Sequence, residues 1–357
     1  MKYKKLLGYL IILIVQIAGL KILSQYPVFI EKYYTNGIYP YISKAFRFIL
    51  GWIPFSFGDL MYALLIIFLL ISLVNLFRNR FRNGLKYLTD ALLITNIIYF
   101  SFHLLWGFNY YRLPLHQALK IENDYTTEEL ISLSQRLIKR ANDLHLELEK
   151  NDSLPVRFSY SLNEIFDKTL DGYLEVEENF PKLDYPPKSI KNSLFRYPLS
   201  VMGFSGYLNP ITNESHINGL IPPHRWPLVS CHEEAHQLGF AKENEANFIA
   251  VITTTNNKDL YFKYSGYIFA LRYCLSEVYM RNPDAADILK SNIKPGILAN
   301  YKESYDFWSS FSNPLEPILE VFYGHYLKAN NQPSGMKSYS YVVALLVNYF
   351  KTKTTLP

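Results

Sequence analysis

Two histidines four residues apart, with a glutamate directly after the first, form the stretch of the chain best suited to chemistry. They are His232, Glu233 and His236, in the sequence His-Glu-Glu-Ala-His. Residues four apart on a helix project from one face, so both imidazoles can bind one metal ion. The Glu233 carboxylate can then reach water held by that metal and accept its proton. The spacing predicts a zinc site with Glu233 as the catalytic base.

A second acidic stretch follows at a separation that suits a third ligand. Gly239 is a natural helix C-cap and lets the chain turn back after His236. Glu243 and Asn247 are again four apart, so they share one face of a second predicted helix. Glu243 can supply the third metal bond, and Asn247 can orient a ligand imidazole. Glu245 is the rival third ligand, but the residue four positions after it is an isoleucine, which cannot orient a histidine.

The combination of HExxH and ExxA[DN] resembles the gluzincin group of zinc peptidases. The resemblance implies that His232, His236 and Glu243 are the zinc ligands. It also implies that Glu233 is the catalytic base and that Asn247 supports a ligand histidine. Six residues separate His236 from Glu243, fewer than in the best-known gluzincins.

The motif also fits two other patterns. The string HQLGFAKE is similar to the metzincin pattern, whose third ligand would fall at Lys242, but an ammonium group cannot bind zinc. Ser230 and Glu233 fit a capping box, in which the glutamate would merely satisfy a helix N-terminus. A capping box leaves both histidines and the later acidic stretch unexplained, so a metal site is the better interpretation.

Three residues before the motif are weaker candidates. Tyr207, His216 and His224 lie in a loop-rich stretch, where each could stabilise an oxyanion or line the cleft. Each alone is more often a surface or packing residue. The segment 214–221 could be an edge strand that binds an extended substrate, although an ordinary strand is the preferred interpretation.

Three apolar segments precede the motif and predict a membrane domain. They cover residues 6–23, 60–77 and 91–108, each about the length that crosses a bilayer core. The third ends in an aromatic cluster typical of a membrane–water interface. We therefore predict a membrane domain over residues 1–108, with the lipid bilayer as partner, and a hydrolase domain over residues 109–357.

Basic residues beside the apolar segments predict the orientation. Lysines precede the first segment, at positions 2, 4 and 5, and Arg78, Arg80, Arg82 and Lys86 connect the second and third. An odd number of spans with these clusters inside places residues 109–357 on the extracytoplasmic side of the cytoplasmic membrane. Preceded by three spans, the stretch 202–249 resembles an uncharacterised family of bacterial membrane proteins with an extracytoplasmic HExxH domain of unknown function.

The remaining pattern is mainly helical. Helices are predicted over 126–148, after a Thr-Thr-Glu-Glu cap, and over 227–256 and 260–279. Residues 151–223 are expected to form loops with a few strands, and 338–351 a short helix or a buried strand. The predicted fold class is mainly α: three transmembrane helices followed by an α-rich (α+β) zincin-like domain.

Charge and cysteine content exclude two further classes. A net charge of +5 without a long basic run argues against nucleic-acid binding. Cys231 and Cys274 do not have zinc-ribbon spacing, and the sequence leaves open whether they form a disulfide or are two buried thiols.

These features predict a membrane-anchored zinc metallopeptidase that cleaves peptide or protein substrates, with the membrane surface as one expected place of action. Two alternatives stay open: a hydrolase of cell-wall amides, and a non-catalytic membrane scaffold with a structural zinc site.

Overall fold

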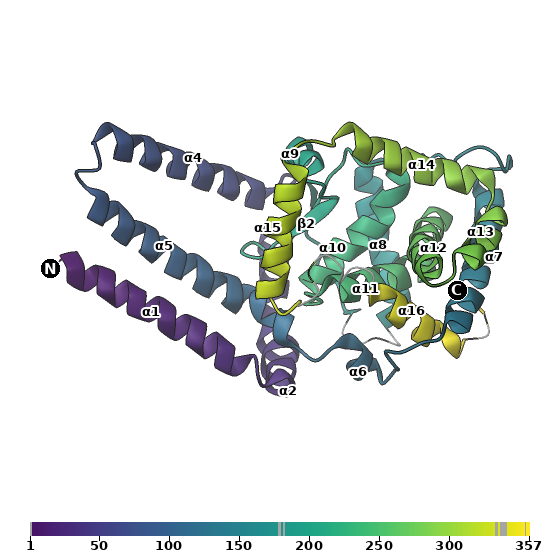
Figure 1. Ribbon diagram of the computed structural model, residues 1–357, viewed down its shortest axis with the longest axis horizontal. Coiled ribbons are helices and arrows are strands. Elements are labelled where there is room, and N and C mark those ends of the chain that lie inside the picture. The colour runs from purple at the N-terminus through teal and green to yellow at the C-terminus, as the bar shows by residue number, and fades with distance from the viewer. Residues whose placement is uncertain (1, 178–179, 181–182, 333–334, 336–340, 354) are drawn as a thin grey trace.

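The computed structural model describes all residues except 1, 178–179, 181–182, 333–334, 336–340 and 354. Three long apolar helices project from a helical domain that contains a small sheet (Figure 1). The predicted mainly α class with three N-terminal apolar helices is therefore confirmed.

The three apolar helices are α1 (Lys2–Leu23), α4 (Phe57–Arg78) and α5 (Gly84–Leu105). Each is long and apolar enough to cross a membrane, and at most 11% of the most apolar window in any of them is buried. Side chains this apolar and this exposed suit lipid as their solvent. The third helix begins at residue 84 rather than the predicted 91 and ends at residue 105, because the chain then tightens into the 3₁₀ helix η2 (Gly107–Tyr111).

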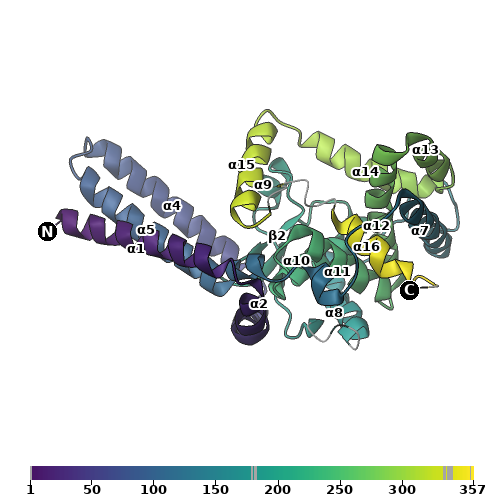
Figure 2. The ribbon, with the colours of Figure 1, turned by 60° about the horizontal axis from the view of Figure 1, so that its bottom comes forward.

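The spans are arranged unequally. Helix α1 packs along α5 (Figures 1 and 2), whereas α4 diverges from α5 towards the domain in Figure 1. Asn96 of α5 donates to the carbonyl of Tyr9 at 3.1 Å and accepts from Gln16 at 3.3 Å. Such polar contacts hold helices together where the surrounding lipid offers no hydrogen bonds.

The connection between the first two spans packs on the helical domain. It forms α2 (Pro27–Phe29), the π-helix η1 (Ile30–Ile38) and α3 (Tyr39–Gly51). The Tyr39 and Ser43 hydroxyls both donate to the carbonyl of Gln237, at 2.7 and 2.8 Å. They satisfy an otherwise unpaired carbonyl at the end of the helix that carries the HExxH motif.

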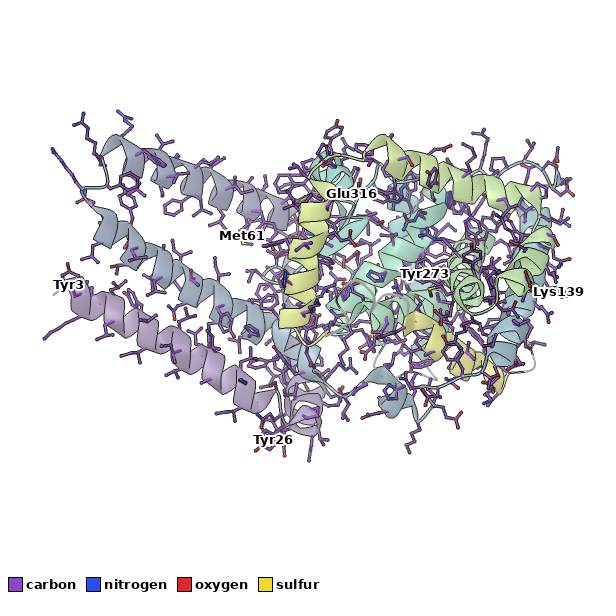
Figure 3. All side chains as sticks on the ribbon, in the orientation of Figure 1. Tyr3, Tyr26, Met61, Lys139, Tyr273 and Glu316 are labelled. Carbon is purple, nitrogen blue, oxygen red and sulfur yellow. The ribbon has the colours of Figure 1, made fainter. Side chains whose placement is uncertain are left out.

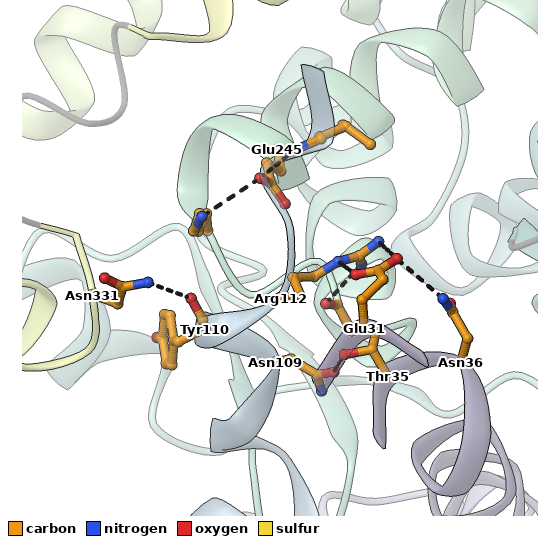
Figure 4. A network of polar contacts seen from close by, with 11 residues as sticks. Glu31, Thr35, Asn36, Asn109, Tyr110, Arg112, Glu245 and Asn331 are labelled. Atoms are coloured by element: carbon orange, nitrogen blue, oxygen red, sulfur yellow. Dashed lines mark hydrogen bonds and ion pairs between the residues drawn. The ribbon is translucent and has the colours of Figure 1, made fainter. Parts of the chain in front are cut away.

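A buried ion pair joins η1 to the segment after the third span (Figure 4). Arg112 Nε lies 3.0 Å from Glu31 Oε2, and their side chains are 2% and 9% exposed. We expect Glu31→Ala to lower the free energy of unfolding by about 3–5 kcal/mol, because the guanidinium would remain buried without its carboxylate. Denaturant unfolding in detergent measures the change.

A surface ion pair provides the control for that experiment. Lys44 and Asp184 lie 3.1 Å apart with side chains 53% and 51% exposed. Solvent screens such a pair, so Asp184→Ala should cost about 0–1 kcal/mol. Equal losses in the two variants would contradict the role assigned to the Glu31–Arg112 pair.

The core of the helical domain surrounds α11 (Glu243–Asn256). Helices α8 (Leu162–Glu177), α10 (Trp226–Gln237), α12 (Leu260–Arg281) and α16 (Val342–Lys351) all pack against it. Every residue of α11 from Glu245 to Thr255 is buried, as expected of a helix enclosed on all sides. This enclosure fixes the position of the residues at its first turn.

Helix α7 (Thr127–Leu148) packs on the outside of α12. Thr126 and Glu129 form the capping box at its start, which confirms the predicted cap. The described part of the predicted segment 338–351 is helical, as α16, while residues 338–340 lie outside the described residues. The stretch 151–223 was predicted without a helix, and α8 corrects that prediction.

The remaining elements enclose the site and the core. They are α6 (Leu115–Leu119), α9 (Arg196–Val201), η4 (Pro223–Arg225), α13 (Pro283–Ser291), α14 (Pro295–Ser310) and α15 (Glu316–Ala329). In the view of Figure 1, α15 runs across the region between the spans and α10, and its residues line the same cavity as theirs.

The sheet has three strands in the order β1–β3–β2. Strand β1 (Ile190–Asn192) is parallel and β2 (Gly206–Asn209) antiparallel to β3 (Glu214–Ile217). The segment 214–221 therefore contains the central strand, as the preferred interpretation required. Strand β2 is an edge strand, and its residues 206–208 line a cavity of about 1870 Å³.

Candidate metal centre

Helix α10 carries the HExxH motif along one face and ends directly after it. Gly239 adopts a φ of 90°, and its N–H donates to the carbonyl of His236 at 3.0 Å, while Phe240 donates to Ala235 at 3.1 Å. This pair of bonds is a Schellman motif, so the predicted glycine C-cap is present. The helix begins at Trp226, one turn before Ser230, so the alternative capping box at Ser230 is wrong.

Two imidazoles and a carboxylate converge after the turn. Glu243 Oε2, at the start of α11, lies 3.2 Å from His232 Nε2 and 3.6 Å from His236 Nε2. Ligands about 2.0–2.1 Å from a tetrahedral zinc ion are separated by about 3.3–3.4 Å. The two distances to Glu243 Oε2 and the donor set of two nitrogens and one oxygen both fit zinc.

Glu233 lies beside this group. Ligand atoms of His232, Glu233 and His236 all lie within 4.8 Å of one another, which makes them a group able to hold a metal ion. Glu233 is 4% exposed, and its Oε2 has no hydrogen-bond partner among the described residues. Gly206 of β2 is packed so closely that a Cβ there would come within 2.7 Å of Glu233 Oε1. A buried carboxylate oxygen without a partner is expected where a charged or hydrogen-bonding ligand completes the site.

The chain orients His236 from both sides. Its Nδ1 lies 2.7 Å from the carbonyl of Phe240, which accepts the Nδ1 proton and leaves Nε2 to face Glu243. Trp106, directly after the third span, donates its indole N–H to the carbonyl of His236 at 2.9 Å. The turn after α10 therefore sets which nitrogen of His236 faces Glu243, and the end of a span holds the His236 backbone.

Other side chains contact the remaining two proposed ligands. The Tyr323 hydroxyl of α15 donates to Glu243 Oε1 at 3.2 Å. Burial lowers the pKa of the His232 imidazole, against smaller raising effects of Glu243 and of Asn247. His232 Nδ1 and Asn247 Nδ2 both have no hydrogen-bond partner among the described residues. The predicted role of Asn247 in orienting a ligand imidazole stays a prediction.

Burial and charge act in opposite directions on the site. Burial raises the pKa of Glu233 to about 8. Burial alone would lower the pKa of His236, but the neighbouring Glu243 carboxylate raises it to about 9. The histidines hold the pKa of Glu243 well below its usual range, against the effect of burial. Glu233, His236 and Glu243 are thus buried together, and protons offset the charge of their carboxylates. A bound divalent cation would offset that charge in place of the protons.

Glu245 contacts the start of α6 and Lys242 (Figure 4). Its Oε1 accepts a 2.9 Å hydrogen bond from the backbone N–H of Leu115, and Lys242 lies 4.0 Å away. The carboxylate thus anchors the start of α6, and this placement favours Glu243 as the third ligand.

The three weaker candidates all make hydrogen bonds elsewhere. The His216 ring lies 2.6 Å from Ser56 Oγ through Nε2 and is stacked on Tyr207, whose hydroxyl donates to Asp59. His224 lies between Ser304 and Glu303 of α14. Tyr207 lines the cavity at the metal centre, whereas His216 and His224 do not. His216 and Tyr207 instead connect the sheet to the start of the second span through these hydrogen bonds.

A cavity of about 1870 Å³ opens over the metal centre. Its walls come from all three spans, from β2, and from α10, α12 and α15. Figure 3 labels Met61, Glu316 and Tyr273, which line it from α4, α15 and α12. Arg225 and Arg272 also line it, and neither forms an ion pair with a described residue. The sequence did not identify these wall residues, because no local pattern signals them.

The two cysteines take no part in the centre. Cys231 and Cys274 are both buried and free, which answers the question that the sequence left open. Burial raises the pKa of both thiols, as expected of unreactive cysteines in a core.

Together, the fold and the centre define a helical membrane protein whose domain carries a buried group of histidine and glutamate side chains able to hold a metal ion. The chain belongs to the DUF3810 family, described as proteins of unknown function, whose model matches residues 34–347. No curated protein and no solved structure gives a significant match. The family assignment confirms the predicted membership of an uncharacterised family, while the resemblance to gluzincins stays a prediction.

Proposed function

We propose that this protein is a membrane-anchored zinc hydrolase, most simply a gluzincin-like metallopeptidase. One observation carries the proposal: Glu243 Oε2 lies within 3.2 and 3.6 Å of the two HExxH imidazoles, with Glu233 beside them. Two histidines and one glutamate leave an open position on the metal, which catalysis requires and structural zinc sites lack.

Each residue then has a defined role in amide hydrolysis. His232, His236 and Glu243 would hold zinc, which supplies a Lewis acid that polarises the scissile carbonyl. Glu233 would take a proton from the attacking water as the new C–O bond forms. It would deliver that proton to the amide nitrogen as the C–N bond breaks. Gly206, by its lack of a side chain, leaves room for the Glu233 carboxylate.

Removal of the metal tests this function directly. The purified full-length protein should cleave a randomised peptide library, lose that activity after dialysis against a chelator, and regain it when zinc is added back. The expected loss is at least about 10²-fold, because the carbonyl would no longer be polarised. Activity that survives complete zinc removal in the folded protein would contradict the proposal.

We further propose that the metal centre lies outside the cytoplasm. The basic residues before α1 and in the connection around Arg82 support this orientation. In intact cells, a membrane-impermeant maleimide should label Lys290→Cys but not Arg82→Cys, since both positions are exposed in the protein. The native cysteines are buried and should give little background. The opposite labelling pattern would reverse the orientation.

A further inference from the structure

The cavity at the metal centre is continuous with the apolar surface of the spans. On one side it is lined by His232, Glu233 and Glu243. On the other it is lined by side chains of the three apolar helices, among them Ile17, Leu20, Leu65, Ile66, Ile97 and Ile98. These residues lie inside the segments that are apolar enough to cross a bilayer.

Helix α10 runs along this cavity from its membrane end to its far end. Leu228, Val229, His232, Glu233 and His236 line the cavity at helical spacing, so one face of α10 forms a wall. The His236 end is fixed to the end of α5 by the Trp106 hydrogen bond. The opposite end, at Arg225, is about 16 Å away for eleven residues of helix. The metal centre therefore lies at the membrane end of the cavity.

The two spans that form the apolar walls are separated where they meet the domain. Helices α4 and α5 diverge from their connection towards the domain in Figure 1, and residues of both helices line the cavity there. Since α1 packs on α5, the apolar end of the cavity lies between α4 on one side and the α1–α5 pair on the other. An apolar segment from the bilayer would find lipid-like walls there on both sides.

The domain surface around the cavity is itself apolar and exposed. On α15, Ile318, Val321 and Phe322 are 65%, 61% and 73% exposed, while Tyr323 of the same helix contacts Glu243. Phe48 of α3 and Trp52, directly after that helix, are 75% and 78% exposed. Large exposed apolar side chains next to transmembrane helices suit contact with the bilayer interface. The metal centre is thus covered by a helix whose outer face fits the membrane.

We infer that the substrates are polypeptides anchored in the same bilayer. The anchor would lie between α4 and α5, and the chain would be cut shortly after it emerges and meets Glu233 and the metal. This inference rests on the proposed hydrolase function and adds its substrate class. Arg225 and Arg272, which form no ion pair with a described residue, favour negative charge on the released part.

The test compares one randomised peptide library in three forms: free, N-terminally palmitoylated, and joined to a leucine-rich transmembrane helix. The zinc-loaded full-length protein is reconstituted in vesicles of phosphatidylethanolamine and phosphatidylglycerol, and mass spectrometry locates the cuts. We expect anchored forms to be cut about ten-fold faster or more, with cuts clustered close to the anchor. A preference between the palmitoyl and the helical form identifies the anchor.

Substitution of two neighbouring leucines distinguishes two causes of faster cleavage: binding of the anchor between the spans, and simple enrichment of anchored peptides on the vesicle. Leu65 lines the cavity, whereas Leu64 is 67% exposed and does not. Leu65→Trp should fill the apolar end and lower cleavage of anchored peptides by about ten-fold, with zinc content and melting temperature unchanged. Leu64→Trp should behave like the wild type.

The outcomes distinguish the two proposals. Equal cleavage of free and anchored peptides, or identical behaviour of the two leucine variants, would overturn the membrane-anchored substrate and leave the hydrolase intact. Absence of cleavage of every form by zinc-loaded protein would overturn the hydrolase, and the substrate class with it.

Discussion

Glu233→Gln is expected to lower the turnover of a cleaved peptide by about 10²–10⁴-fold, the usual contribution of a general base. The amide keeps the size of the carboxylate but cannot accept the proton of the attacking water. The change should appear in kcat rather than KM, because Glu233 acts on the reacting water and not on substrate binding. Turnover with a peptide from the randomised library measures it.

The zinc content of that variant must stay at the wild-type value, because Glu233 is not among the three proposed ligands. Glu320→Gln, on an exposed position of α15 outside the cavity lining, is the matched control for the loss of one carboxylate. It should leave turnover unchanged within about two-fold, as is usual for a surface substitution. Full activity in Glu233→Gln would remove the catalytic role of this residue and favour a structural metal site.

The membrane helices could be predicted from sequence because their signal is local. Residues 60–77 contain no charge, and the structure extends that run only to Phe57 and Arg78. The third span was placed seven residues late at its start, since Lys86 and Asp90 interrupt the apolar pattern although the helix continues through them. Charge content identifies the apolar core of a span better than its ends.

The turn between the two site helices could also be predicted. Gly239 has the positive φ that the Schellman motif requires, and it sets Glu243 back against the histidines. Helix α8 was missed for a different reason. Its apolar residues recur at helical spacing, from Leu162 and Ile165 to Tyr173 and Val176, but the flanking stretches rich in proline and asparagine dominated the composition of residues 151–223.

The walls of the cavity could not be predicted, because they depend on contacts between distant segments. Tyr39 binds the carbonyl of Gln237, almost two hundred residues later, and Trp106 binds that of His236. The residues of α4 and α5 that line the cavity have the same apolar character as those that face lipid. Periodicity in one segment does not reveal which other segment it meets.

The zinc content of the protein should depend on His236 and Glu243. Wild-type protein should carry about one zinc ion per chain, as a site with three protein ligands predicts, and His236→Ala and Glu243→Gln should each lose most of it. His236 contributes the Nε2 that faces Glu243, and the neutral amide of glutamine is a poor ligand for zinc. Mass spectrometry of the metal in dialysed, folded protein measures the content.

Glu245→Gln is the control that decides the third ligand. Its carboxylate accepts from the backbone of Leu115, 2.9 Å away, so this variant should keep its zinc and lose some stability instead. Asn247→Ala should weaken zinc binding by about 10–100-fold without abolishing it, as expected of a residue that supports a ligand imidazole. If Glu245→Gln lost its zinc and Glu243→Gln kept it, Glu245 and not Glu243 would be the third ligand. Well-folded wild-type protein that binds no added zinc would contradict the metal centre altogether.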